Sequence, residues 1–227
     1  LYTHAVWLIL AAVIFDSLDG RLARMGGRTS LFGAEFDSLA DVVSFGVAPG
    51  LLVYHWSLYQ TGTVGLVVGF VFAGAGAVRL ARFNVLSMNE RGQPTKPGKY
   101  ILGLPVPGAA GILISLVVAH HAAPGVLLGP RTAWAMVGLT LFLAFLMVST
   151  IKFRSFKDLR LNARSLALVG VAVGSSAIVS LQTKPAFVLV WLLTFYVAIG
   201  LVETVLTFPK RKLRDKARAP SPSTPPN

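Results

Sequence analysis

Hydrophobic residues gather in seven long runs along this chain, and the short stretches between the runs carry turn formers and charges. Each run is long enough, or nearly so, to cross the apolar core of a bilayer as a helix, which takes about 20 residues. The pattern therefore predicts an all-α fold, a polytopic helical membrane bundle of about seven transmembrane helices. These are expected over residues 2–21, 36–58, 63–86, 104–121, 133–150, 166–181 and 186–208.

The composition agrees with this pattern. Hydrophobic residues make up 54% of the chain and charged residues 13%, and the mean hydropathy is +0.68, outside the range of soluble domains. The absence of cysteine excludes disulfides, thiolate catalysis and cysteine-ligated metal centres. We expect one transmembrane domain over residues 1–208. A basic, Pro- and Ser-rich disordered cytoplasmic tail follows over residues 209–227.

Positive charges lie on one side of the predicted membrane. If residues 21–28 face the cytoplasm, alternation puts 79–99, 152–164 and 210–218 on that side too, and these four regions hold 19 of the 21 Lys and Arg residues. Cytoplasmic loops keep an excess of positive charge, so this asymmetry supports seven crossings with a cytoplasmic C-terminus. The net charge of +12 then reflects topology and attraction to anionic membrane lipids. Without a soluble basic domain, we expect no nucleic acid partner.

Acidic residues are concentrated in one short window. Five of the nine acidic residues lie between positions 16 and 41. On helices, Asp16 and Asp19 are i,i+3 neighbours and Asp37 and Asp41 are i,i+4 neighbours, so each pair shares one face. The predicted topology puts this window at the cytoplasmic ends of the first two helices.

Four carboxylates on converging faces need positive partners, because each ionised Asp inside a membrane costs about 2.5–3.5 kcal/mol. All-oxygen ligation suits Mg²⁺ or Mn²⁺, and two such ions suit phosphate chemistry. Gly20, Ala23 and Gly33 leave surface where a bulky ligand can approach the backbone. With Arg24 available for phosphate, the window predicts a site for a phosphorylated, metal-bound ligand.

The same residues resemble the signature of a known family, the CDP-alcohol phosphatidyltransferases. All eight fixed positions are present, as Asp16-x2-Asp19-Gly20-x2-Ala23-Arg24-x8-Gly33-x3-Asp37-x3-Asp41. The resemblance implies an integral membrane enzyme in which an alcohol displaces CMP from a CDP-linked lipid. It further implies a homodimer. It also implies another membrane helix ahead of the first acidic helix, so that we expect eight helices in the complete protein.

Further stretches are similar to the phosphatidylserine synthase branch of that family. They lie at residues 36–49, 79–84, 103–107 and 147–157. This similarity implies transfer of a phosphatidyl group from CDP-diacylglycerol to the hydroxyl of L-serine, which yields phosphatidylserine and CMP. It implies a bacterial protein of the cytoplasmic membrane, with its active site at the cytoplasmic face.

The resemblance also implies roles for the motif residues. Two divalent ions, Mg²⁺ or Mn²⁺, would clamp the diphosphate, and their ligands would be Asp16, Asp19, Asp37 and Asp41. Asp41 would in addition be the catalytic base that takes the proton from the serine hydroxyl. The CDP-lipid would be bound by Gly20, Ala23, Arg24 and Gly33.

Selection of serine requires a cation for its carboxylate. Arg79 and Arg82 lie one helical turn apart near the cytoplasmic end of the third predicted helix, and Asn84 adds an amide. The alternative is that both arginines are topology anchors that extend to the membrane surface. Lys152 and Arg154 are predicted to help bind serine or phosphate.

Two alternative functions stay open. The acceptor could be glycerol phosphate, an inositol phosphate or another amino alcohol, because the eight-position motif concerns only the CDP-lipid. The acidic cluster could instead line a cation path in a transporter. Transporters commonly place such residues near mid-membrane and often contain internal repeats, and this sequence has neither. Separately, the spacing of Gly65 and Gly69 predicts close helix packing.

Overall fold

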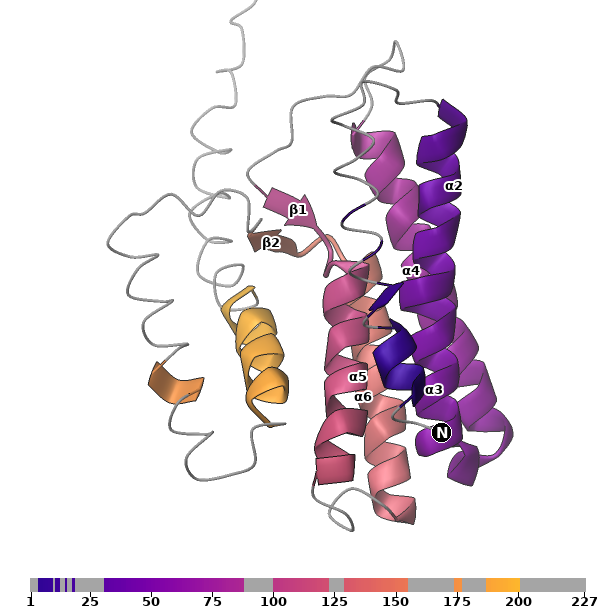
Figure 1. The fold of residues 1–227 in the computed structure, drawn as a ribbon, viewed down its shortest axis with the longest axis vertical. Helices are drawn as coiled ribbons and strands as arrows, with labels where there is room; N and C mark the ends of the chain where they lie inside the picture. Colours follow the sequence, from indigo (N-terminus) through magenta and orange to yellow (C-terminus); the bar gives the residue numbers. More distant parts are fainter. Residues whose placement is uncertain are drawn as a thin grey trace, which may run out of the picture.

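Long helices run side by side along the length of the molecule (Figure 1). The computed structural model describes residues 4–9, 11–12, 15, 18, 31–87, 100–122, 129–154, 174–176 and 187–200. In chain order its labelled elements are α2 (Leu31–Asp41), the π-helical turn η1 (Val42–Val47), α3 (Ala48–Trp56), the 3₁₀ turn η2 (Leu58–Thr61), α4 (Thr63–Ser87), β1 (Tyr100–Leu102), α5 (Val106–Ala122), α6 (Pro130–Val148) and β2 (Lys152–Arg154). A further apolar helix covers Phe187–Gly200.

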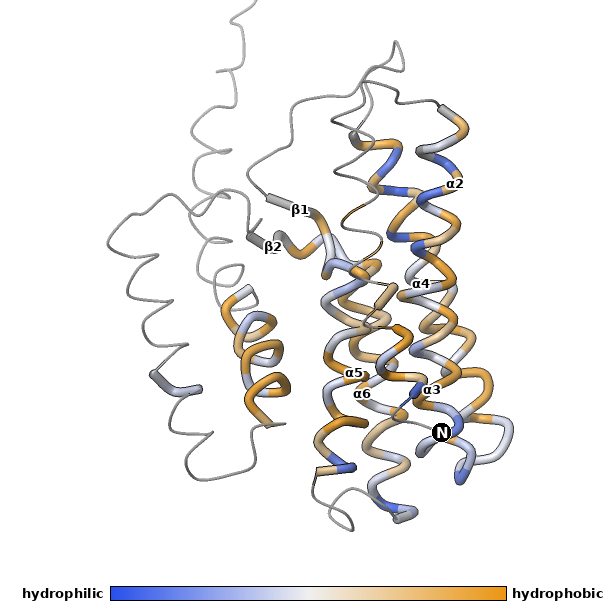
Figure 2. Tube along the Cα trace, in the orientation of Figure 1, coloured by the Kyte–Doolittle hydropathy of each residue, from blue (hydrophilic) through white to orange (hydrophobic). Residues whose placement is uncertain are grey.

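The helices have the length and composition that a membrane requires. Within the part of the chain that the structure describes, three are long and apolar enough to cross a bilayer, at Glu35–Trp56, Thr63–Leu86 and Pro130–Val148. Val106–Ala122 and Phe187–Gly200 are shorter apolar helices. Hydrophobic residues extend along most of each helix (Figure 2). The predicted helical membrane bundle is therefore confirmed, and the predicted helices at 36–58 and 63–86 match the observed ones closely.

Three predicted helices are described only in part. Residues 4–9, 11–12, 15 and 18 are helical within the predicted helix at 2–21, residues 174–176 within that at 166–181, and residues 187–200 within that at 186–208. The predicted tail over 209–227 lies outside the described residues.

One continuous helix contains a π-helical turn where the sequence predicted a regular helix. The backbone stays in the right-handed helical region at Asp41 (φ −60°, ψ −43°) and at Ala48 (φ −61°, ψ −46°), so α2, η1 and α3 follow one another without a break. A π turn accommodates an extra residue and changes the face that later side chains occupy; such turns are frequent at functional sites. Here the turn begins directly after Asp41.

Small residues allow this helix to cross α4 at close range. A Cβ atom added to Gly50 would lie 3.0 Å from the carbonyl oxygen of Gly69. One added to Gly46 would lie 3.4 Å from the carbonyl oxygen of Ala73. The backbones of the two helices therefore touch, as expected for small residues spaced by four. Gly65 lies against the carbonyl of Leu58 on the preceding turn η2. The predicted role in close helix packing is therefore confirmed for Gly69, whereas Gly65 contacts the turn ahead of its own helix.

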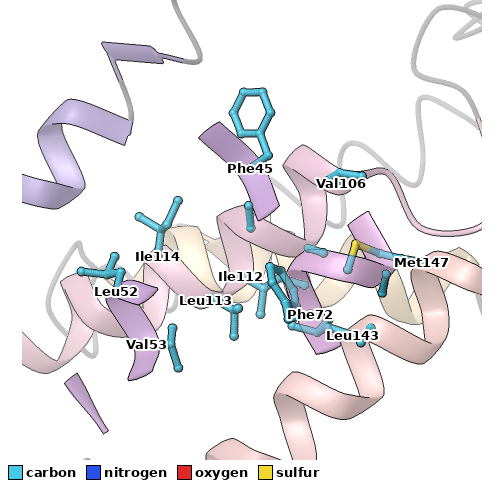
Figure 3. Close-up of a cluster of buried hydrophobic side chains, with 14 of the residues drawn as sticks. Phe45, Leu52, Val53, Phe72, Val106, Ile112, Leu113, Ile114, Leu143 and Met147 are labelled. Atoms are coloured by element: carbon cyan, nitrogen blue, oxygen red, sulfur yellow. The ribbon is translucent and has the colours of Figure 1, made fainter. Parts of the chain in front are cut away.

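The hydrophobic core lies between α3, α4, α5 and α6. The close-up in Figure 3 shows side chains from these helices meeting there. Its largest fully buried members include Phe45, Phe72, Leu113, Leu143 and Met147. Large apolar side chains also remain exposed on the outside of the bundle, such as Phe36 and Phe70. In a membrane these outer side chains would face lipid.

A two-stranded sheet connects the start of α5 to the end of α6. Strands β1 and β2 are antiparallel, with Ile101 opposite Phe153. The Gly103 N–H donates to the carbonyl of Ile151 at 2.8 Å, and that of Leu104 donates to Leu146 at 3.0 Å. Gly103 has φ +76°, and any side chain there would meet the Met147 backbone. The sheet and these hydrogen bonds thus bring together two stretches, 103–107 and 147–157, that in the sequence are related only by their resemblance to one family branch.

Candidate active site

Asp37 and Asp41 occupy the last turns of α2, immediately before the π turn. Their i,i+4 spacing places them on one face of that helix. Asp37 is exposed, whereas Asp41 is half-buried. Between them Ser38 accepts a hydrogen bond of 2.8 Å from the side-chain amide of Asn84 on α4. This bond holds the acidic turn of α2 against the final turn of α4.

Arg79 of α4 is buried beside this acidic turn. Only 7% of its surface is exposed, and its guanidinium interacts electrostatically with the carboxylate of Asp41. Its Cζ lies 5.2 Å from the centre of the Phe83 ring, a cation–π contact. Nε is buried and has no hydrogen-bond partner within the described part of the chain. This burial disfavours the alternative in which Arg79 extends to the membrane surface.

Arg82 contacts a different helix. Its Nη1 donates to the carbonyl oxygens of Val148 at 3.1 Å and Ser149 at 3.4 Å. These carbonyls belong to the C-terminal end of α6, where backbone acceptors lack helical partners and the helix dipole favours a cation. Arg82 therefore connects α4 to α6, next to the β1–β2 sheet.

Tyr196 brings a third segment of the chain to Arg79. It belongs to the Phe187–Gly200 helix, is half-buried against the core, and interacts electrostatically with the Arg79 guanidinium. One turn earlier, Leu193 packs on α5, where a Cβ atom on Gly111 would lie 3.1 Å from its Cδ1. Tyr196 is not among the site residues that the sequence predicts. The available signal was a tyrosine inside an apolar run, whose hydroxyl needs a polar partner.

Comparison with known proteins decides the family. Residues 2–148 match the model of the family described as CDP-alcohol phosphatidyltransferase. This chain belongs to the CDP-alcohol phosphatidyltransferase family. The resemblance carried by the eight-position motif is thereby confirmed.

Several curated relatives of this phosphatidyltransferase share one name, CDP-diacylglycerol–serine O-phosphatidyltransferase. The protein of that name from Helicobacter pylori (strain J99) is 41% identical over 171 residues, which cover 74% of this chain and 68% of the relative. The one from Methanocaldococcus jannaschii is 44% identical over 107 residues, or 47% of each chain. That from Saccharomyces cerevisiae is 42% identical over 114 residues, or 50% of this chain and 41% of the relative.

The structure describes some of the remaining predicted site residues of this phosphatidyltransferase. Gly33 is exposed on α2, one turn before Asp37. Lys152 and Arg154 belong to β2 and pair with β1 through their backbones, but their side chains are not described. Outside the described residues lie Asp16, Asp19, Gly20, Ala23 and Arg24.

The carboxylates of Asp37 and Asp41 have the right chemistry for part of a metal site. Oxygen donors on adjacent turns suit hard divalent cations such as Mg²⁺ and Mn²⁺. Among the described residues, no group of three or more His, Asp or Glu side chains is close enough to hold a metal ion. The predicted ligand set therefore depends on Asp16 and Asp19 to complete it.

Proposed function

We propose that this chain transfers the phosphatidyl group of CDP-diacylglycerol to the hydroxyl of L-serine, giving phosphatidylserine and CMP. Family membership supports a CDP-linked lipid as the donor of the phosphatidyl group. The shared name of relatives that are 40–44% identical supports serine as the acceptor. The structural observation that carries the proposal is the burial of the cation Arg79 within electrostatic range of Asp41, the last motif acid.

The reaction needs a base for the serine hydroxyl, and Asp41 takes that role. As the serine oxygen attacks the phosphorus that bears diacylglycerol, its proton passes to the Asp41 carboxylate. The bond from that phosphorus to the bridging oxygen of CMP breaks, and CMP leaves with the electron pair. Half-burial of Asp41 at the end of α2 leaves its carboxylate accessible from one side.

A pair of divalent cations, Mg²⁺ or Mn²⁺, fits the motif acids. The expected ligands are Asp16, Asp19, Asp37 and Asp41, whose donors are all carboxylate oxygens. When bound, the ions supply positive charge that offsets the charge of the diphosphate and of the departing CMP.

The CDP-lipid approaches beside the motif glycines. Gly33 lies exposed on the turn before Asp37, where the absence of a side chain leaves room for the ligand. Gly20, Ala23 and Arg24 of the same motif, which lie outside the described residues, would bind the same ligand.

Serine recognition centres on Arg79. Its burial keeps water from competing for the guanidinium, which strengthens an ion pair with the serine carboxylate. Arg82 and Asn84 support the site by holding α4 against α6 and α2. Lys152 and Arg154 lie on the strand that follows the Arg82 contact, where they can hold lipid phosphate.

The enzyme works at the cytoplasmic face of a bacterial cytoplasmic membrane, where soluble serine meets membrane-held lipid. The charge asymmetry supports this orientation, since 19 of the 21 basic residues fall on the predicted cytoplasmic side. Membrane lipids surround the exposed apolar side chains of α2 and α4. The active form is a homodimer, by analogy with the family.

An acceptor assay tests the proposed function. Purified protein in mixed micelles would receive CDP-diacylglycerol, Mg²⁺ or Mn²⁺, and radiolabelled serine, glycerol phosphate, inositol phosphate or ethanolamine in parallel. We expect labelled lipid and CMP with serine, and loss of both when the metal is chelated. Greater turnover with another acceptor would overturn serine as the substrate. In a parallel measurement on sealed liposomes that contain the protein, cation flux without CMP release would favour a transporter.

A further inference from the structure

We propose that Tyr196 determines acceptor specificity by binding, together with Arg79, the carboxylate of the amino acid that receives the phosphatidyl group. The inference rests on the proposed function and extends it to a residue outside the eight-position motif. It starts from the burial of Arg79 against Phe83 and the packing of Tyr196 on the core. Electrostatic interactions connect Arg79 to Tyr196 and to Asp41 on two other helices.

The Arg79 guanidinium retains hydrogen-bonding capacity for a ligand. A guanidinium carries five N–H donors in a planar fork that matches a carboxylate. One face of the Arg79 side chain lies over Phe83 at 5.2 Å, and Asp41 attracts the group from α2. The buried Nε has no acceptor in the portion of the chain that the structure describes. A buried donor of this kind is costly unless a ligand satisfies it.

Tyr196 is held in place by packing around it. Its ring contacts the hydrophobic core. The next residue, Val197, is buried. One turn before Tyr196, the Leu193 side chain lies against Gly111 of α5. A phenolic oxygen can accept a hydrogen bond from a guanidinium and donate its own proton to a carboxylate oxygen. Tyr196 can therefore add a neutral donor beside the cation.

The carboxylate of Asp41, the cation of Arg79 and the neutral hydroxyl of Tyr196 together complement an amino acid that carries a hydroxyl. The serine hydroxyl would approach Asp41, while the carboxylate would meet Arg79 and Tyr196. An amino alcohol without a carboxylate would leave the buried guanidinium without that partner. Sites built around a polar group of the substrate strongly reject analogues that lack it. The arrangement thus explains how one site would choose serine over ethanolamine.

The Tyr196→Phe variant tests the inference, because it removes one hydroxyl and keeps the ring that packs. At saturating CDP-diacylglycerol, we expect the KM for serine to rise about tenfold or more, since a hydrogen bond to a charged group is lost. The KM for CDP-diacylglycerol should stay within about twofold, as expected when only uniform binding of serine is lost. The preference for serine over ethanolamine should fall by the same factor as the serine KM rises.

Tyr59→Phe is the matched control. Tyr59 is exposed on η2 at the other end of α4, so the loss of its hydroxyl should leave both KM values unchanged. An unchanged serine KM in Tyr196→Phe, or equal increases for both substrates, would overturn the role of Tyr196 while wild-type activity upholds the proposed function. Wild-type protein that releases CMP with another alcohol and not with serine would overturn both.

Discussion

The carboxylate of Asp41 on α2 and the buried guanidinium of Arg79 on α4 attract each other across the helix interface. The two residues are far apart in sequence, so their spacing along the chain does not predict that they interact. Their interaction connects the acidic motif, which is expected to bind the CDP-lipid, with the stretch at 79–84 that resembles phosphatidylserine synthases. The site proposed for serine and the site proposed for the nucleotide lipid therefore share a boundary.

Asp41→Asn should abolish transfer while CDP-diacylglycerol still binds. Asparagine keeps the shape of the side chain but cannot accept the serine proton, and removal of a general base lowers kcat by about 10²–10⁴-fold. CMP release measures turnover, and retention of labelled CDP-diacylglycerol measures binding. Near-normal turnover would remove the base assignment.

Asp37→Asn serves as the comparison for that variant. If Asp37 acts only as a metal ligand, its loss should weaken metal binding, and added Mg²⁺ or Mn²⁺ should restore part of the activity. Activity of Asp41→Asn should not recover in the same way. Equal rescue of both variants would contradict separate roles.

Arg79→Lys should raise the KM for serine by about tenfold or more and change that for CDP-diacylglycerol little. Lysine keeps the charge but loses the planar fork that binds a carboxylate through two bonds. Steady-state kinetics with each substrate varied in turn gives the two constants. Arg131→Lys is the control, because Arg131 is exposed near the start of α6, at the opposite end from the Arg82 contact. Equal effects of Arg79→Lys on both substrates would instead support a structural role.

The Ser38 and Asn84 side chains should be energetically coupled. Their hydrogen bond of 2.8 Å joins α2 to α4, and such bonds contribute about 0.5–1.5 kcal/mol. Single and double alanine variants, compared by thermal unfolding in detergent, give the coupling free energy. Strictly additive effects would show that this bond does not hold the acidic turn in place.

Gly50→Ala should destabilise the crossing of α3 and α4. The new methyl group would lie 3.0 Å from the carbonyl oxygen of Gly69, and overpacking of this kind costs about 1–3 kcal/mol. Gly74→Ala, on α4 with nothing within 4 Å of the new atom, should leave the unfolding temperature unchanged or slightly higher. Equal effects of the two substitutions would contradict the close backbone contact.

Hydropathy predicts the long helices because lipid leaves the backbone no polar partner outside the helix. The helices at 36–58 and 63–86 follow from that requirement alone. Shorter features depend on tertiary contacts and leave no periodic signal. The π turn at Val42–Val47 lies where Gly46 meets the backbone of Ala73, and the three-residue strands β1 and β2 are too short to alternate detectably.

The candidate site likewise contains one relationship that the sequence predicts and others that depend on tertiary packing. Spacing within one helix predicts that Asp37 and Asp41 share a face, because both residues belong to one regular element. The interaction of Arg79 with Tyr196 could not be predicted, since it depends on tertiary packing of a helix more than a hundred positions later in the chain. The different surroundings of Arg79, which is buried, and Arg82, which binds the end of α6, depend on how α4 packs against α6.

Isotope transfer from serine tests the central claim most directly. Serine labelled with ¹⁸O in its hydroxyl would be incubated with CDP-diacylglycerol, the purified protein and Mg²⁺ or Mn²⁺, and the lipid and nucleotide products analysed by mass spectrometry. Direct attack by the serine oxygen predicts phosphatidylserine that retains the label and unlabelled CMP in equal amount. Absence of a serine-containing lipid, or phosphatidylserine without the label, would contradict the account.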